Sequence, residues 1–101
     1  MNIKEINKKV LNVALSHINI LPEKAQEPFR LYIEKGIIPK SPFLQAILAN
    51  SFVDILGYRN KETLDTLYKY GNFMLNYMPS SSWGSYEILE EWAKYKKEGN
   101  R

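Results

Sequence analysis

Five prolines divide this chain of 101 residues into short segments and so limit the length of any regular element. Proline lacks a backbone N–H and disfavours the interior of helices and of central strands. Between the prolines, apolar residues recur at spacings of three and four, the period of an amphipathic helix. The sequence therefore predicts an all-α fold, a compact orthogonal bundle of about five short helices in a single domain over residues 1–101.

The first expected helix is an amphipathic segment over residues 1–21, followed by a motif-bearing core over residues 28–97. The apolar face of the first helix consists of Ile3, Ile6, Val10, Val13, His17 and Ile20. His17 is the one histidine of the chain. Its place on this face favours a hydrogen-bonded imidazole in the core or in an interface over a metal ligand or a base.

Proline and glycine predict the limits of the second helix. We expect a turn over residues 22–27 and a helix over residues 28–35, because proline suits the first turn of a helix. Gly36 then ends this helix in the left-handed conformation. Pro39 marks an extended elbow after it.

A third helix is expected over residues 42–56. Ser41 is its N-cap and Pro42 its first residue, while Gly57 ends it. The apolar residues of this helix cover more than one side. Such a helix is either central in the core or part of a subunit interface.

A fourth helix, over residues 61–78 with Asn60 as its N-cap, carries two apolar stripes. One stripe consists of Leu64, Leu67, Tyr68, Gly71, Leu75 and Met78, and the other of Tyr70, Phe73 and Tyr77. Glycine inside a helix costs about 1 kcal/mol relative to alanine, so we expect a close approach of backbone or of a large ring at Gly71. A monomer of this size buries one stripe, and the other then needs a partner.

The segment after Pro79 predicts a corner that connects to a last helix. Ser85 is expected to be the N-cap of this helix, with Gly84 in the tight turn before it. Trp83 is expected to fill the space beneath the corner, and Trp92 to anchor the last helix in the core.

Composition excludes several classes of protein. There is no cysteine, which excludes disulfides, thiolate metal sites and a cysteine nucleophile. The net charge of +3 is typical of a mixed surface rather than of a dedicated nucleic-acid binder. No apolar run approaches the length of about 18 residues that a membrane span needs. We therefore expect a cytoplasmic protein that does not act at a membrane.

Catalytic and metal-binding patterns are not evident in the sequence. Glu87, Glu90 and Glu91 fall on the outer face of the last helix, as solvated carboxylates do. The glycines are isolated, so no phosphate-binding loop is formed. The carboxylates follow neither calcium-loop nor zinc spacing. We therefore expect no enzyme activity, no cofactor and no structural metal.

Two separate motifs carry a resemblance to a known family. The residues concerned are Tyr32, Ile33, Gly36, Ile37, Pro39, Phe43, Leu44, Ala46, Ile47, Leu48, Asn50, Trp83, Gly84, Ser85 and Trp92. In this order and spacing they resemble a family of small helical proteins encoded by bacteriophages, prophages and plasmids. Two positions depart from the family pattern: Ser51 stands where the family usually has Asp, and Ser82 where it often has Cys.

The resemblance implies an accessory protein of a mobile element, in a bacterial host cell, and no catalytic role. Together with the excess of tyrosine, it leads us to expect a non-enzymatic protein that binds, and interferes with, a host protein such as one of antiviral defence. The candidate binding surface consists of Asn50, Tyr58, Arg59, Tyr70, Phe73 and Tyr77. Tyrosine offers a large rigid contact area with a polar tip.

Two other functions remain open from the sequence. An oligomer would act as a sponge for a nucleotide messenger, held between subunits by Asn50, Arg59 and tyrosines. A DNA-associated regulator is the other alternative, although residues 42–56 contain no Lys or Arg to contact phosphates.

Overall fold

The computed structural model describes residues 3–58 and 62–99, with residues 3–7 described by their backbone alone. Within these ranges the regular structure is entirely helical. The elements are α1 (Ile3–Ser16), η1 (Ile18–Ile20), α2 (Glu23–Lys35), α3 (Pro42–Ala49), α4 (Phe52–Tyr58), α5 (Leu64–Asn76), η2 (Ser80–Ser82) and α6 (Tyr86–Gly99), where η denotes a short 3₁₀ helix. The predicted all-α class is thus confirmed.

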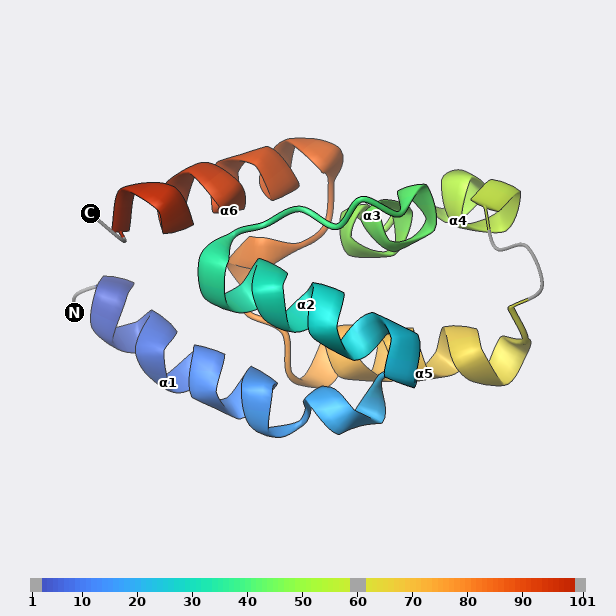
Figure 1. Cartoon of the computed structure of the whole chain (residues 1–101), viewed down its shortest axis with the longest axis horizontal. Coiled ribbons are helices and arrows are strands. Elements are labelled where there is room, and N and C mark those ends of the chain that lie inside the picture. The colour runs from blue at the N-terminus through green and yellow to red at the C-terminus, as the bar shows by residue number, and fades with distance from the viewer. Residues whose placement is uncertain (1–2, 59–61, 100–101) are drawn as a thin grey trace.

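Helix α2 runs through the middle of the molecule and separates two groups of helices (Figure 1). On one side lie α6, α3 and α4, where α3 packs against both α4 and α6. On the other side lie α1, η1 and α5, with η1 in contact with both α2 and α5. The start of α1 and the end of α6 lie at one end of the molecule, while α4 and the start of α5 lie at the other (Figure 1).

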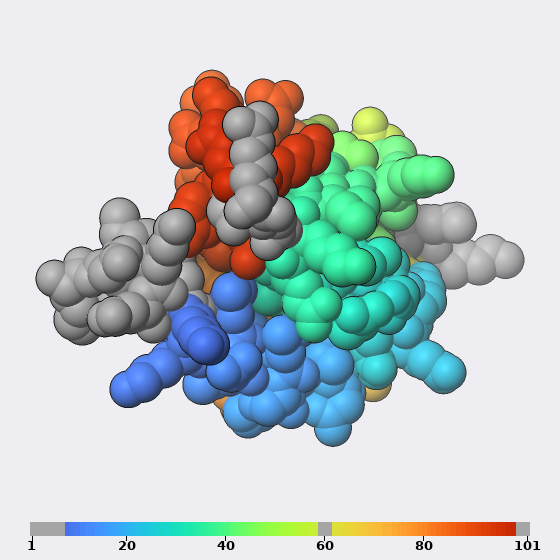
Figure 2. Space-filling model, turned by 60° about the vertical axis from the view of Figure 1, so that its left-hand side comes forward, coloured from blue at the N-terminus to red at the C-terminus, as the bar shows by residue number. Residues whose placement is uncertain are grey.

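Seen from the end that holds the start of α1, α1 and α6 lie on opposite sides, with the end of α2 and the segment after it beside them (Figure 2). The first helix is shorter than predicted and ends at Ser16 rather than near residue 21. The Ser16 hydroxyl donates to the carbonyl of Val13 at 2.8 Å, a local bond that competes with the helical ladder. The 3₁₀ helix η1 follows.

Helix α2 begins five residues earlier than predicted, so that Pro28 lies inside it. The proposed turn over residues 22–27 is therefore wrong. Ala25 and Phe29 are both fully buried on the inner face of α2, and this burial offsets the backbone hydrogen bond that Pro28 cannot make. The predicted end of the helix is correct, because Gly36 adopts a φ of 71° and its N–H donates to Tyr32 at 2.9 Å.

The helix predicted over residues 42–56 is broken into α3 and α4. Ser41 does cap α3, since its Oγ accepts from the N–H of Leu44 at 3.3 Å. Asn50 then adopts the left-handed conformation with a φ of 54° and ends α3, a conformation that asparagine tolerates better than most residues. Gly57 lies within α4 rather than at a helix end. This break accounts for a sixth α-helix among the described residues.

Helix α5 is capped by Thr63, whose hydroxyl accepts from the N–H of Thr66 at 3.2 Å. The predicted cap, Asn60, lies outside the described residues. The end of α5 at Asn76 and the turn at Pro79 agree closely with the predicted limit. At the start of α6, the Ser85 hydroxyl accepts from the N–H of Ile88 at 3.1 Å, as expected for its N-cap.

Candidate binding surface

The last helix is anchored in the core by buried side-chain hydrogen bonds. Trp92 is buried, and its indole Nε1 donates to the carbonyl of Tyr32 at 2.9 Å. The Tyr32 hydroxyl in turn donates to the carbonyl of Ser82 at 2.6 Å. Burial raises the pKa of Tyr32 well above its ordinary value. Trp92 thus has the anchoring place predicted for it, and Tyr32 links it to the corner before α6.

Gly36, which ends α2, lies against the backbone of α6. A Cβ atom at this position would lie 2.7 Å from the Cβ of Lys96 and 3.0 Å from the Cα of Ala93. Pro39 is buried beyond it, and its carbonyl accepts from the side-chain amide of Gln45 at 2.7 Å. Gly84, at a φ of 127°, donates its N–H to the carbonyl of Leu48 at 2.9 Å. Gly36 and Pro39 thus have a structural role where α2 ends, and Gly84 has one in the turn before α6.

Two of the tyrosine-stripe residues predicted for binding lie in the core instead. Tyr70 is 1% exposed and Phe73 is fully buried, and both pack edge-on or tilted against Phe29 of α2. The stripe of Tyr70, Phe73 and Tyr77 is the side of α5 that faces α2, so the side chains of Tyr70 and Phe73 are almost inaccessible to a partner. Tyr77 is half-buried and stacks on His17, with ring centroids 3.9 Å apart.

The His17 imidazole lies in a packing position between the end of α1 and α5. Its Nδ1 is 2.9 Å from the carbonyl of Val13 and 3.1 Å from the Ser16 hydroxyl. In the part of the chain that the structure describes, no group of three His, Cys, Asp or Glu side chains is arranged to hold a metal ion.

The other predicted binding residues do not gather at one place. Asn50 is exposed at the end of α3 and lines an open groove beside α5. Tyr58, 52% exposed, lines a different hollow together with the ion pair between Lys24 and Glu62. Arg59 lies outside the described residues.

The groove that Asn50 lines is bordered by α4 on one side and α5 on the other. It has a volume of about 330 Å³. Its described lining residues are Ile47, Asn50, Phe52, Ile55, Leu56, Leu67, Tyr70, Gly71, Met74, Leu75 and Trp83. None of these side chains is charged, so the groove suits an apolar group better than a phosphate or a carboxylate.

Two residues that line this groove each have a buried polar atom without a hydrogen-bond partner. These atoms are the hydroxyl of Tyr70 and the indole Nε1 of Trp83. Burial, followed by the nearby charge of Glu62, raises the pKa of Tyr70 to about 12. Trp83 was predicted only to fill the space beneath the corner. It also lines the groove, and its indole N–H has no hydrogen-bond partner.

Gly71 leaves the floor of the groove open. A Cβ atom built there would meet nothing within 4 Å outside its own helix. The expectation of a close approach at Gly71 is therefore wrong for the single chain. The glycine leaves a hollow where another side chain would stand.

Large apolar side chains project around the groove. We define the apolar face as Phe52, Val53, Leu56, Leu64, Tyr68 and Leu75, which extend from the groove along α4 and α5. Their exposed fractions range from 46% for Leu56 to 78% for Leu64. Leu64, Tyr68 and Leu75 of the first predicted α5 stripe are thus exposed, whereas Met78 of the same stripe is buried and Leu67 packs against the core. Phe52, Val53 and Leu56 of α4 were not among the predicted binding residues. The apolar character of residues 42–56 on more than one side was the feature that could have indicated them.

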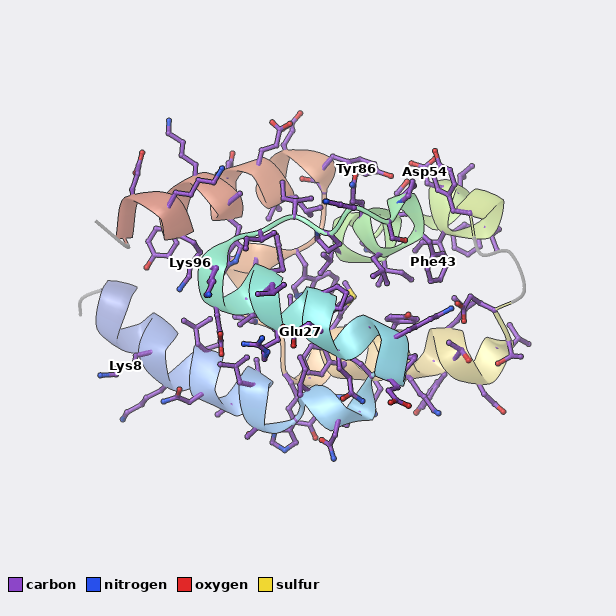
Figure 3. All side chains as sticks on the ribbon, in the orientation of Figure 1. Lys8, Glu27, Phe43, Asp54, Tyr86 and Lys96 are labelled. Atoms are coloured by element: carbon purple, nitrogen blue, oxygen red, sulfur yellow. The ribbon has the colours of Figure 1, made fainter. Side chains whose placement is uncertain are left out.

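The polar groups with shifted pKa values on α4 and α6 lie outside this groove. Tyr86 donates to Asp54 Oδ2 at 2.6 Å, and Ser51 donates to the same oxygen at 2.9 Å. The bond from Tyr86, followed by that from Ser51, lowers the pKa of Asp54. Figure 3 shows Asp54 and Tyr86 together on the outer side of their helices, whereas Phe43 points inward. This pair links α4 to the start of α6.

No protein-family model, no curated protein and no solved structure matches this chain significantly. Its function must therefore be argued from its own surface. Within the described residues, no helix is both long and apolar enough to cross a membrane.

Proposed function

We propose that this chain is a non-enzymatic accessory protein of the phage type that acts by binding a host protein through the apolar face. The observation that carries the proposal is the exposure of this face, where Leu64, Tyr68 and Leu75 are each at least 74% exposed. An apolar patch of this kind, next to an open groove, is characteristic of a protein-interaction site.

A protein partner fits the groove better than a nucleotide does. The described lining residues include no Lys or Arg, which a phosphate would require. Of the predicted nucleotide contacts, Asn50 and the 1% exposed Tyr70 line the groove, and Tyr58 lies in a different hollow. These positions weigh against the nucleotide sponge.

A DNA-associated regulator is also disfavoured by the surface. Helices α3 and α4 contain no Lys or Arg, and a helix that lies against phosphates normally carries cations. Large exposed apolar side chains on α4 would not interact favourably with the charged phosphate backbone of DNA.

The setting in a bacterial host cell, in the cytoplasm, rests on the resemblance to proteins of phages, prophages and plasmids. In that setting the protein would occlude a surface of a host protein, for example one that takes part in antiviral defence. Phe52, Leu56 and Leu75 would form the centre of the contact, because large apolar side chains beside a pocket dominate the energy of many interfaces.

The proposal is tested by affinity capture from a bacterial lysate with the tagged protein and three variants. Phe52→Ser and Leu75→Glu alter the apolar face, while Ile37→Ser alters a side chain of similar chemistry that is 49% exposed elsewhere. We expect one host protein to be retained by the unaltered chain and by Ile37→Ser, and lost with the other two.

The same proteins retained by all four baits would refute docking through this face. A screen of nucleotides by thermal shift tests the sponge separately. We expect no nucleotide to raise the melting temperature.

A further inference from the structure

We propose that the groove between α4 and α5 binds a small, neutral and largely apolar molecule, and that the indole N–H of Trp83 donates a hydrogen bond to an oxygen atom of this ligand. The ligand class is an uncharged ketone, ester or amide attached to a hydrocarbon ring or chain. This ligand site is additional to the host-binding function proposed above and does not depend on it.

The groove has the size of a small-molecule site. Its volume of about 330 Å³ lies within the range of about 300–1,000 Å³ that is usual for ligand pockets. Gly71 contributes to this space, because a Cβ atom built there would meet nothing within 4 Å outside its own helix. The groove therefore has room for a ring with a short substituent.

The lining of the groove favours an uncharged ligand. It includes aliphatic side chains such as Ile47 and Met74, and no lining residue that the structure describes is charged. A carboxylate, phosphate or ammonium group would lose its hydration here without gaining a partner of opposite charge. The hollow beside Tyr58 differs in this respect, because Lys24 and Glu62 line it.

The unpaired indole N–H of Trp83 specifies the polar group of the ligand. Trp83 lines the groove, and its buried Nε1 has no hydrogen-bond partner within the chain. An indole N–H only donates, so the partner that it lacks is an acceptor. Because buried polar groups in folded proteins are almost always paired, an unpaired donor in a groove-lining residue points to an acceptor supplied by a ligand.

Trp83 is a better candidate for this contact than Tyr70, whose hydroxyl is also buried and unpaired. The pKa of Tyr70 is raised to about 12 by burial and then by the charge of Glu62, and Glu62 lines the other hollow. Trp83 lies in the irregular segment between η2 and α6. Its Nε1 is covered in the free chain, and a shift of the indole toward the groove, which breaks no helix, is part of the proposal.

The test uses NMR of the full chain with three probe molecules of nearly the same shape. Acetophenone carries an oxygen acceptor, isopropenylbenzene has a methylene group in place of that oxygen, and benzoate carries a negative charge. We expect acetophenone to bind with a dissociation constant on the order of 1 mM and to shift the Trp83 indole N–H signal. The signal of Trp92, which is bonded to Tyr32 in the core, should stay in place, and benzoate should not bind.

Two matched variants test the hydrogen bond. Trp83→Phe keeps an aromatic ring and removes the N–H, so the preference for acetophenone over isopropenylbenzene should fall about three- to tenfold, as expected for one hydrogen bond. Tyr70→Phe removes the other unpaired polar atom and should leave this preference unchanged. In both variants the Trp92 indole signal reports whether the core is intact.

Two further variants test the location of the site. Leu75→Glu places a charge in the lining of the groove and should weaken the binding of acetophenone at least tenfold. Ile37→Glu changes a side chain that is 49% exposed elsewhere and should leave binding unaltered.

Three results would overturn the inference: no binding of acetophenone at its solubility limit, equal binding of benzoate, or a preference for acetophenone that Trp83→Phe does not reduce. The outcome is independent of host capture. A chain that binds acetophenone as expected but retains no host protein refutes the proposed function alone. A chain that retains a host protein through Leu75 but binds no acetophenone refutes the ligand site alone.

Discussion

Trp92 and Trp83 lie nine residues apart, on either side of the start of α6, and differ in whether the indole N–H has a hydrogen-bond partner. Trp92 donates to Tyr32, and Tyr32 donates to Ser82, so this half of the core has its buried polar atoms paired. Trp83 and Tyr70, in the wall of the groove, have buried polar atoms without partners. The difference shows that the polar groups where α2 meets α6 are satisfied within the chain, whereas two buried polar groups beside the groove between α4 and α5 are not.

The largest expected difference between the two regions concerns their glycines. Gly36→Ala would force a left-handed alanine against the backbone at Ala93, and we expect it to lower the free energy of unfolding by about 3 kcal/mol. Gly71→Ala adds a methyl group to open space within a helix, so it should raise that free energy by up to about 1 kcal/mol.

Urea denaturation of both variants measures this contrast. A similar loss of stability in both would show that Gly71 is packed as tightly as Gly36, and the groove as described would not exist.

The two tryptophans permit a matched comparison. Trp92→Phe removes the donor to the Tyr32 carbonyl and leaves a buried acceptor unpaired, which should cost about 2–3 kcal/mol including lost packing. Trp83→Phe removes a buried N–H that has no partner, so the lost packing is offset by the removal of an unsatisfied group. We therefore expect Trp83→Phe to lower the free energy of unfolding by less than about 1 kcal/mol.

Thermal and urea unfolding at neutral pH measure both variants. Equal costs would mean that the Trp83 indole N–H has a partner in solution, and the contrast between the two halves would be lost.

Alkaline pH should distinguish the two buried tyrosines. Both hold their protons more tightly when folded, since the pKa of Tyr32 is raised by burial and that of Tyr70 is raised to about 12. Their contribution is therefore complete below pH 10, the ordinary tyrosine pKa, and is lost as the pH rises above it, by up to about 1.4 kcal/mol per pH unit for each group.

Tyr70→Phe should reduce the slope of stability above pH 10 and leave stability at pH 7 unchanged, because its hydroxyl bonds to nothing. Tyr32→Phe should reduce the same slope but cost about 1–3 kcal/mol at pH 7, since the Ser82 carbonyl loses its donor. Urea unfolding at pH 7, 10 and 11.5 provides the measurement. A marked loss for Tyr70→Phe at pH 7 would contradict the assignment.

The smallest effect concerns the pair that links α4 to α6. Tyr86→Phe removes the principal bond that lowers the pKa of Asp54, so this pKa should rise toward its ordinary value. Tyr58→Phe serves as the control, because the Tyr58 hydroxyl is not among the groups that shift Asp54. NMR titration of the Asp54 carboxyl would reveal the change, and an unchanged pKa would show that α4 is not held by this bond.

The features that sequence alone predicted correctly are those with local causes. Ser41 and Ser85 cap their helices and Gly36 ends α2, because each effect depends on a residue and its immediate neighbours. The start of α2 was missed because it depends on the burial of Ala25 by other elements. The break at Asn50 was missed because nothing in an apolar run excludes a continuous helix.

The sequence predicted exposed apolar side chains on the fourth helix, but not which of its two stripes carries them. The pattern of two apolar stripes on one helix agrees with the exposure of Leu64, Tyr68 and Leu75, although Met78 of the same stripe is buried. The composition of the stripes did not reveal which of them faces α2. The stripe of Tyr70, Phe73 and Tyr77 was predicted to bind a partner because of the chemistry of tyrosine. The packing of Tyr70 and Phe73 against Phe29 determines which stripe is buried, and this contact joins residues about forty positions apart.

The position of the two outermost helix ends has a practical consequence. The start of α1 and the end of α6 lie together, away from α4 and the start of α5, in a molecule 41 Å long (Figure 1). A bead, fluorophore or fusion protein attached beyond either end would stand clear of Phe52 and Leu64. Immobilised molecules would thus present these side chains outward to whatever is passed over them.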